Sequence, residues 1–130
     1  MTGLDTSVIL RLLIGEPVDQ ARHAREFLDT LFESGEQAVV SDLVVTEAYF
    51  ALQHHYQVPK AEALAALALL LHSGEILGNG AAPAVLKLKN LASAKPGFVD
   101  RLIHAAYSQD GGAMATFEKK SRRLENVRVL

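Results

Sequence analysis

The order in which short apolar runs and helical segments follow one another most constrains the fold of this chain. Residues 1–4 form an apolar run that ends at Asp5, and the segment 6–14 that follows is apolar nearly all round. The same order recurs at residues 38–40, where the hydroxyl residue Ser41 and the acid Asp42 follow the apolar run and precede another helical segment. Buried parallel strands that lead into helices have this pattern. The sequence therefore predicts an α/β fold with a parallel sheet.

Hydrophobic spacing and turn residues divide the 130 residues into alternating strands and helices. Gly15, Gly35 and Gly74 mark helix ends, and Pro17 and Pro59 stand where helices begin. This order predicts one domain over residues 1–130, with three α/β/α layers and a central parallel sheet of order 3-2-1-4-5 covered by helices on both faces. The expected strands are 1–4, 38–40, 75–78, 113–116 and 127–130, and the expected helices are 6–14, 17–35, 43–56, 59–72, 82–92, 98–109 and 118–123.

Composition excludes several protein classes. The hydrophobic share of 49% and the charged share of 22% are ordinary for a globular domain. There is no cysteine, which excludes a disulfide framework and thiol chemistry and fits a reducing compartment. No basic region followed by a signal-length apolar stretch opens the chain, and the apolar window 61–71 is too short to cross a bilayer. We expect a cytoplasmic protein that does not enter the membrane.

The two halves of the chain carry opposite charge. Residues 1–65 hold four Lys/Arg and ten Asp/Glu, whereas residues 66–130 hold nine and five, so the net charges are −6 and +4. This asymmetry suggests an acidic patch facing a basic one. The basic residues of the second half are either solvated helix faces or contacts to phosphate. They are Lys87, Lys89, Lys95, Arg101, Lys119, Lys120, Arg122, Arg123 and Arg128.

Four acids stand where this architecture gathers ligands. Asp5 ends the first strand, and Glu118 follows the fourth; these strands are neighbours in the order 3-2-1-4-5, so the two acids would lie side by side. Glu47 lies in the second turn of the helix after the second strand, and Asp100 in the first turn of helix 98–109. Four carboxylates in one crevice repel one another unless a divalent cation lies between them, and oxygen-only ligation favours Mg²⁺ or Mn²⁺. Such sites hydrolyse phosphodiesters.

Each acid also has a purely structural interpretation. Asp5 is in place to cap helix 6–14, and Asp100 and Glu118 lie where a helix macrodipole favours an acid by about 0.3–1 kcal/mol. Glu47 is either a surface residue or, in a segment of largely buried neighbours, an acid that needs a partner. The agreement of the four positions favours the metal site.

Other site chemistries find little support. Neither G-x-x-x-x-G-K-[ST] nor G-x-G-x-x-G occurs, so no Gly-rich loop cradles a nucleotide. The five histidines show no H-x-x-x-H or H-E-x-x-H pair, which argues against zinc. His104 follows Asp100 by one helical turn and is expected to be a structural histidine with a hydrogen-bond partner.

Four segments together resemble the motifs of the PIN-domain family, and most closely those of the VapC-type toxin ribonucleases of type II toxin–antitoxin pairs. The resemblance covers the whole chain. Leu4-Asp5-Thr6-Ser7 resembles the family's opening motif, and 41–47 resembles the segment that carries the second acid. Residues 98–106 are similar to the D-A-L-I-A-A helix start, and Ala115-Thr116-Phe117-Glu118 stands at the family's T-F-D.

The resemblance implies a Mg²⁺- or Mn²⁺-dependent endoribonuclease that forms a homodimer and is neutralised by a cognate antitoxin protein. It implies that the metal-site and catalytic acids are Asp5, Glu47, Asp100 and Glu118, and that the polar residues around them or toward the RNA substrate are Thr6, Ser7, Thr116 and Arg101.

Three departures from the family pattern bear on activity. Glu118 stands where Asp is usual, and Gly97 stands where many members have another acid; both would weaken a second metal position or abolish activity. Arg101 replaces a small residue and would either pair with an acid or contact RNA phosphate. The rival hypothesis is therefore a catalytically weakened or inactive PIN-like module that acts through protein or RNA binding.

Overall fold

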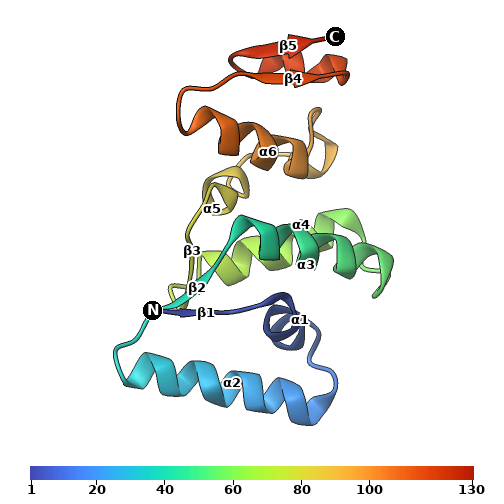
Figure 1. The fold of residues 1–130 in the computed structure, drawn as a ribbon. Helices are drawn as coiled ribbons and strands as arrows, with labels where there is room; N and C mark the ends of the chain where they lie inside the picture. The colour runs from blue at the N-terminus through green and yellow to red at the C-terminus, as the bar shows by residue number, and fades with distance from the viewer.

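The computed structural model describes all residues from Met1 to Leu130 (Figure 1). Its five strands follow one another in the predicted order, and its helical segments do so too, except that two short segments replace the expected helix 82–92. The strands are β1 (Thr2–Gly3), β2 (Ala38–Val40), β3 (Ile76–Gly78), β4 (Met114–Thr116) and β5 (Val127–Val129). The helices are α1 (Thr6–Ile14), α2 (Val18–Glu33), α3 (Asp42–His54), α4 (Lys60–Leu71), α5 (Ala82–Val85) and α6 (Phe98–Ser108), with 3₁₀ turns η1 (Leu91–Ser93) and η2 (Lys119–Arg123).

Local chemistry explains where the first helices begin and end. Asp5 and Ser41 cap α1 and α3 with side-chain oxygens that accept backbone amides. Pro17 and Pro59 directly precede α2 and α4. Gly15 ends α1 in the left-handed conformation with φ of 79°, which costs glycine little because it lacks a Cβ atom.

One predicted helix was wrong in extent. The segment 82–92 was expected to be one helix, but α5 ends at Val85 and only the turn η1 follows, at Leu91–Ser93. The amides of Lys87 and Leu88 already bond three residues back, and Asn90 has a left-handed φ of 58°. A residue in that conformation cannot continue a right-handed helix.

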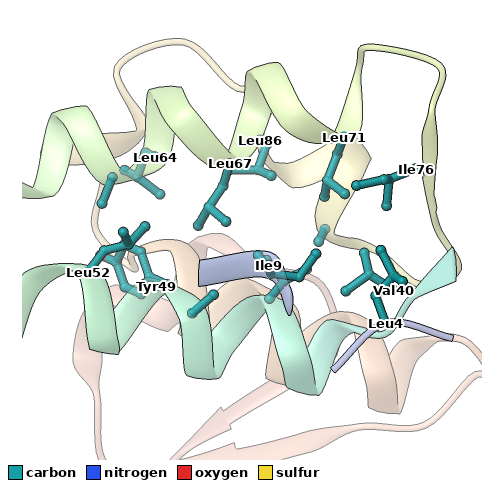
Figure 2. Close-up of a cluster of buried hydrophobic side chains, with 14 of the residues drawn as sticks. Leu4, Ile9, Val40, Tyr49, Leu52, Leu64, Leu67, Leu71, Ile76 and Leu86 are labelled. Atoms are coloured by element: carbon teal, nitrogen blue, oxygen red, sulfur yellow. The ribbon is translucent and has the colours of Figure 1, made fainter. Parts of the chain in front are cut away.

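The hydrophobic core lies mainly between the helices that follow the first three strands. Figure 2 shows α3 and α4 facing each other across leucine side chains, with Ile9 of α1 and Val40 of β2 filling the space between them. A cluster of 21 buried side chains runs from Leu4 to Leu102. In Figure 1, α2 lies on one side of β1 and the α3–α4 pair lies on the other, as expected for helices on both faces. No helix has the length and apolar character that a bilayer crossing requires.

All strand pairs are parallel, as predicted, but they form two sheets. The first has the order β1-β2-β3, and the second contains only β4 and β5. The α/β class with a parallel sheet is therefore confirmed, whereas the continuous sheet of order 3-2-1-4-5 was wrong at the junction of β1 with β4. In Figure 1 the β4–β5 pair lies at one end of the molecule, separated from β1 by α5 and α6.

The physical reason lies in α6 and the residues around it. Phe98, at its start, is 1% exposed and packs against Tyr49 of α3 with ring centroids 5.1 Å apart, so α6 begins in the core and carries the chain away from β1. The hydrogen bonds of residues 110–130 to other segments reach only residues 95–108. We call residues 95–130 the C-terminal block, because the hydrogen bonds of residues 110–130 stay within this range.

Candidate active site

Asp5 stands at the end of the first strand and caps α1. Its Oδ1 accepts the Val8 amide at 3.2 Å and the Ser7 hydroxyl at 2.6 Å. These bonds stabilise the carboxylate and lower the pKa of Asp5, the Ser7 hydroxyl having the larger effect. The capping interpretation of Asp5 is therefore correct. It leaves the carboxylate exposed and ionised, as a cation ligand must be.

Glu47 reaches the same place from the second strand–helix unit. The Thr6 hydroxyl, next to Asp5 in the chain, donates to Glu47 Oε1 at 3.0 Å. Glu47 is exposed and has a hydrogen-bond partner, Thr6, so the bond joins the N-terminal parts of α1 and α3. Of the predicted acids, Glu47 is the one that contacts a direct chain neighbour of Asp5.

Asp100 lies in the first turn of α6, beside α3. It lines a hollow of about 270 Å³ together with Tyr49, Phe50, Lys60 and Gly97. No hydrogen bond or ion pair holds its carboxylate, although Lys60 shares the hollow. Asp100 therefore lies near Tyr49 and Phe50 of α3, which follow Glu47 by two and three residues. Its place in the first turn of α6 also suits the helix macrodipole.

Glu118 lies with the β4–β5 pair. Its Oε1 accepts the Lys120 amide at 2.9 Å, which caps η2, and its own amide donates to the Thr116 hydroxyl at 3.0 Å. Because β4 does not pair with β1, the structure does not place Glu118 beside Asp5, and that prediction was wrong for the single chain.

A divalent cation does not fit the acids as one chain arranges them. Nowhere does the structure bring three or more His, Cys, Asp or Glu side chains close enough to hold a metal ion. The oxygen-only donor set suits Mg²⁺ or Mn²⁺, but its members are divided between the Asp5–Glu47 pair, the hollow of Asp100 and the β4–β5 pair.

The basic residues of the second half are available to an anion. All four ion pairs of the molecule are made by residues 1–75, so none of the nine Lys and Arg side chains after residue 65 is paired. Arg101 does not pair with an acid; its Nε donates to the Pro96 carbonyl at 2.8 Å. His104 has the expected structural partner, the Glu125 carbonyl at 2.7 Å.

Sequence reasoning missed the role of Asp42. Its carboxylate accepts the amides of Ala81 and Ala82 at 2.9 and 3.0 Å, and so ties the start of α3 to the turn before α5. The close approach of Gly80 to that carboxylate was signalled only by the Gly78-Asn79-Gly80 turn. A Cβ on Gly80 would lie 2.5 Å from Asp42 Oδ2.

Comparison with known proteins gives one positive result. No curated protein and no solved structure matches the chain. A family model described as PIN domain matches residues 4–127. The match spans the strand–helix units that hold Asp5, Glu47, Asp100 and Glu118. The chain therefore belongs to the PIN domain family, whose members are generally nucleases.

Proposed function

We propose that this protein is a Mg²⁺- or Mn²⁺-dependent endoribonuclease, the toxin of a type II toxin–antitoxin pair. In this proposal Asp5, Glu47, Asp100 and Glu118 form the catalytic and metal-binding set. Thr6, Ser7, Thr116 and Arg101 support these acids or the substrate. The protein acts in the cytoplasm, forms a homodimer and is neutralised by a cognate antitoxin.

The observation that carries the proposal is the Asp5–Thr6–Glu47 arrangement. The Thr6 hydroxyl donates to Glu47 Oε1, so the second acid contacts the residue that directly follows the first acid in the chain. The contact joins the helices that follow the paired strands β1 and β2. Carboxylates at the carboxyl ends of neighbouring parallel strands are where α/β sheets bind ligands. Capping of α1 accounts for the Asp5 carboxylate but not for the contact of Glu47 with Thr6.

The unpaired basic residues support RNA as the substrate. Eight of the nine Lys and Arg side chains after residue 65 are exposed, and Arg101 is half-buried. Cations that are not neutralised by a neighbouring acid are available to phosphate. The acidic half carries Asp5 and Glu47, and the basic half carries Asp100, Glu118 and the cations that would hold the RNA backbone.

RNA cleavage by the purified protein tests the proposal. Asp5→Asn and Asp100→Asn are expected to abolish Mg²⁺-dependent cleavage of single-stranded RNA while circular dichroism shows an unchanged fold. The matched control is Asp19→Asn, whose carboxylate is exposed on α2 and pairs only with Arg22. Full activity in both site variants would refute the proposal, as would equal loss in the control.

A second candidate function is a non-catalytic PIN-like module that binds protein or RNA. The specific observation in its favour is that one chain does not bring three acids together. In addition, Glu118 stands where the family usually has Asp, and Gly97 stands where many members have another acid. Calorimetric titration with Mn²⁺ separates the two functions. The module predicts no binding, or binding that Asp5→Ala leaves unchanged. The enzyme predicts binding that Asp5→Ala removes. A neighbouring reading frame for a small antitoxin-like protein would favour the toxin.

A further inference from the structure

Two strands of this chain end in open edges that are complementary to each other. β1 pairs only with β2, and β4 pairs only with β5. The amides of Thr2 and Leu4 bond toward β2, so by alternation the Gly3 amide and carbonyl point to the open side. Met114 donates toward β5 and Thr116 accepts from it, so the Ala115 backbone groups also point outward. Unpaired edges of this kind are templates for strand addition.

The residues that follow β1 and β4 could extend a pairing of these two edges. Asp5 follows Gly3 by two positions and Glu118 follows Thr116 by two positions, and both acids have extended backbones, with φ, ψ of −90°, 178° and −78°, 108°. A parallel pairing of Gly3 with Thr116 brings the outward-pointing backbone groups of Gly3 and Ala115 within reach of each other. In that register Asp5 lies directly across from Glu118, at the usual strand spacing of about 4.8 Å.

Charge and exposed apolar surface favour the same contact. Residues 1–94 carry six Lys/Arg and eleven Asp/Glu, net −5, whereas the C-terminal block carries seven and four, net +3. The block also leaves large apolar side chains uncovered: Phe117 is 80% exposed and Tyr107 is 54% exposed. Opposite charge favours association of these two surfaces, and a contact at the β4 edge would be next to the exposed Phe117.

The partner for each edge is a second copy of this chain. Within one chain, α6 is anchored in the core at Phe98 and Leu102 and holds β4 apart from β1, with α5 and α6 between them (Figure 1). A neighbouring chain presents the missing edge without disturbing that anchor. We propose that the protein forms a strand-exchanged dimer, in which β4 and β5 of each copy extend the β1 edge of the other and deliver Glu118 to its Asp5–Glu47 site.

This proposal accounts for the divided acids, and its catalytic consequence rests on the proposed function. A twofold dimer makes two such contacts at once, each identical. Each site then contains Asp5 and Glu47 of one copy and Glu118 of the partner copy, while Asp100 of the first copy stays beside α3. Three carboxylates that no single chain gathers then lie at one site.

Engineered disulfides test the strand exchange without reference to activity, and the natural chain has no cysteine to interfere. The test variant carries Gly3→Cys and Thr116→Cys; a Cβ on Gly3 meets nothing within 4 Å. Cross-strand neighbours about 4.8 Å apart lie within the range of a disulfide. Oxidation should convert most of the protein into a covalent dimer of twice 14.1 kDa on a non-reducing gel.

The matched control carries Gly3→Cys and Val129→Cys. Val129 is the partner of Thr116 on β5, so it would lie two strand spacings, about 10 Å, from Gly3, beyond the reach of a disulfide. Three results would overturn the proposal: a monomer with an internal disulfide, in which the chain closes on itself; no disulfide at all; or equal dimer yield from the control.

Mixing two inactive variants tests the shared site. Asp5→Asn and Glu118→Gln are each expected to be inactive alone. In a strand-exchanged dimer of the two, one site carries both changes and the other carries none. Refolding an equal mixture should therefore restore about a quarter of wild-type cleavage, since half of the dimers are mixed and each has one intact site.

The two experiments separate the possible failures. A covalent dimer without RNA cleavage by the wild-type chain would retain the strand exchange and refute the proposed function. Cleavage by the wild type, loss in both variants and no recovery in the mixture would retain the function and overturn the shared site.

Discussion

The Thr6 hydroxyl donates a hydrogen bond of 3.0 Å to Glu47 Oε1 and thereby joins two strand–helix units that are 41 residues apart. The bond holds the carboxylate of a flexible side chain beside the residue that follows Asp5. Neither residue is buried, so the bond adds little to stability; its importance is positional.

Thr6→Val tests that positional role. Valine keeps the shape of threonine and removes the donor, so we expect RNA cleavage to fall about ten- to a hundredfold because a catalytic group is misplaced. The free energy of unfolding should change by about 1 kcal/mol or less. Thr6→Ser keeps the hydroxyl and should retain activity. Thr30→Val is the matched control, since its hydroxyl donates only to the Glu26 carbonyl of its own helix. Equal activity of Thr6→Val and wild type would show that Glu47 needs no such support.

Ser7→Ala tests the origin of the low pKa of Asp5. The Ser7 hydroxyl bonds the ionised carboxylate at 2.6 Å and is the main cause of the lowered pKa. Its removal should raise the pKa of Asp5 toward the ordinary aspartate value. Carbon-detected NMR titration of the Asp5 carboxyl measures the shift. Ser34→Ala, whose hydroxyl donates to the Leu31 carbonyl, should leave it unchanged.

The same change has a defined effect on stability. The pKa of Asp5 is lower in the folded chain than in the unfolded chain, so ionised Asp5 stabilises the fold above the unfolded pKa, and this contribution is lost as pH falls through the folded pKa. Ser7→Ala narrows the gap between the two values. It should therefore lower the free energy of unfolding by an amount that is constant above the ordinary aspartate pKa and disappears as pH falls through the folded pKa of Asp5. Urea denaturation at several pH values checks this; a difference between Ser7→Ala and wild type that stayed unchanged below the folded pKa would contradict the assignment.

The contact between Asp42 and the turn before α5 should be a larger source of stability. Asp42→Ala removes the acceptor for the Ala81 and Ala82 amides, and we expect the free energy of unfolding to fall by about 1–3 kcal/mol. Gly80→Ala should cost a similar amount, because its Cβ would lie 2.5 Å from the carboxylate. Gly3→Ala is the control, with open space around its Cβ.

Urea denaturation of the double variant distinguishes the two causes. If Gly80→Ala acts only by displacing the Asp42 carboxylate, Asp42→Ala/Gly80→Ala should be no less stable than Asp42→Ala alone. Strictly additive losses would show that the two residues act independently.

The chain's local chemistry predicts its elements well. The cap of Asp5 and the stop at Gly15 placed α1 at Thr6–Ile14, as the structure has it. These signals act within a few residues of one another, so sequence spacing alone contains them. The left-handed Asn90 that interrupts the expected helix at 82–92 has no comparable signature in the sequence.

Long-range pairing was less predictable for a physical reason. Asp42 finds its partners 39 and 40 residues away, and nothing in the spacing distinguishes that role from an ordinary acid in the first turn of a helix. The edge of β4 would satisfy either β1 of its own chain or β1 of another copy. The strand patterns are identical in both cases, so the sequence predicts the edge but does not predict its partner.

Gly97 offers the last test, because one position affects both α6 and the candidate metal site. Gly97 is the N-cap of α6, has extended φ, ψ of −85°, −166°, and provides no side-chain hydrogen bond. A Cβ there meets only the Ala94 carbonyl, at 3.8 Å. Both Gly97→Asp and Gly97→Asn should cap α6 and raise the free energy of unfolding by a few tenths of a kcal/mol, whereas Gly97→Ala, which cannot cap, should lower it by about 0.5–1 kcal/mol.

Metal binding separates the two capping variants. Gly97→Asp adds a carboxylate three residues before Asp100, where many family members have an acid, so calorimetry should show tighter Mn²⁺ binding than in the wild type. Gly97→Asn has nearly the same shape and cap but no charge, and its Mn²⁺ affinity should stay at the wild-type level. Equal tightening in both variants would mean that a better-ordered α6, and not an added ligand, controls the affinity. No tightening in either would show that position 97 lies outside the site.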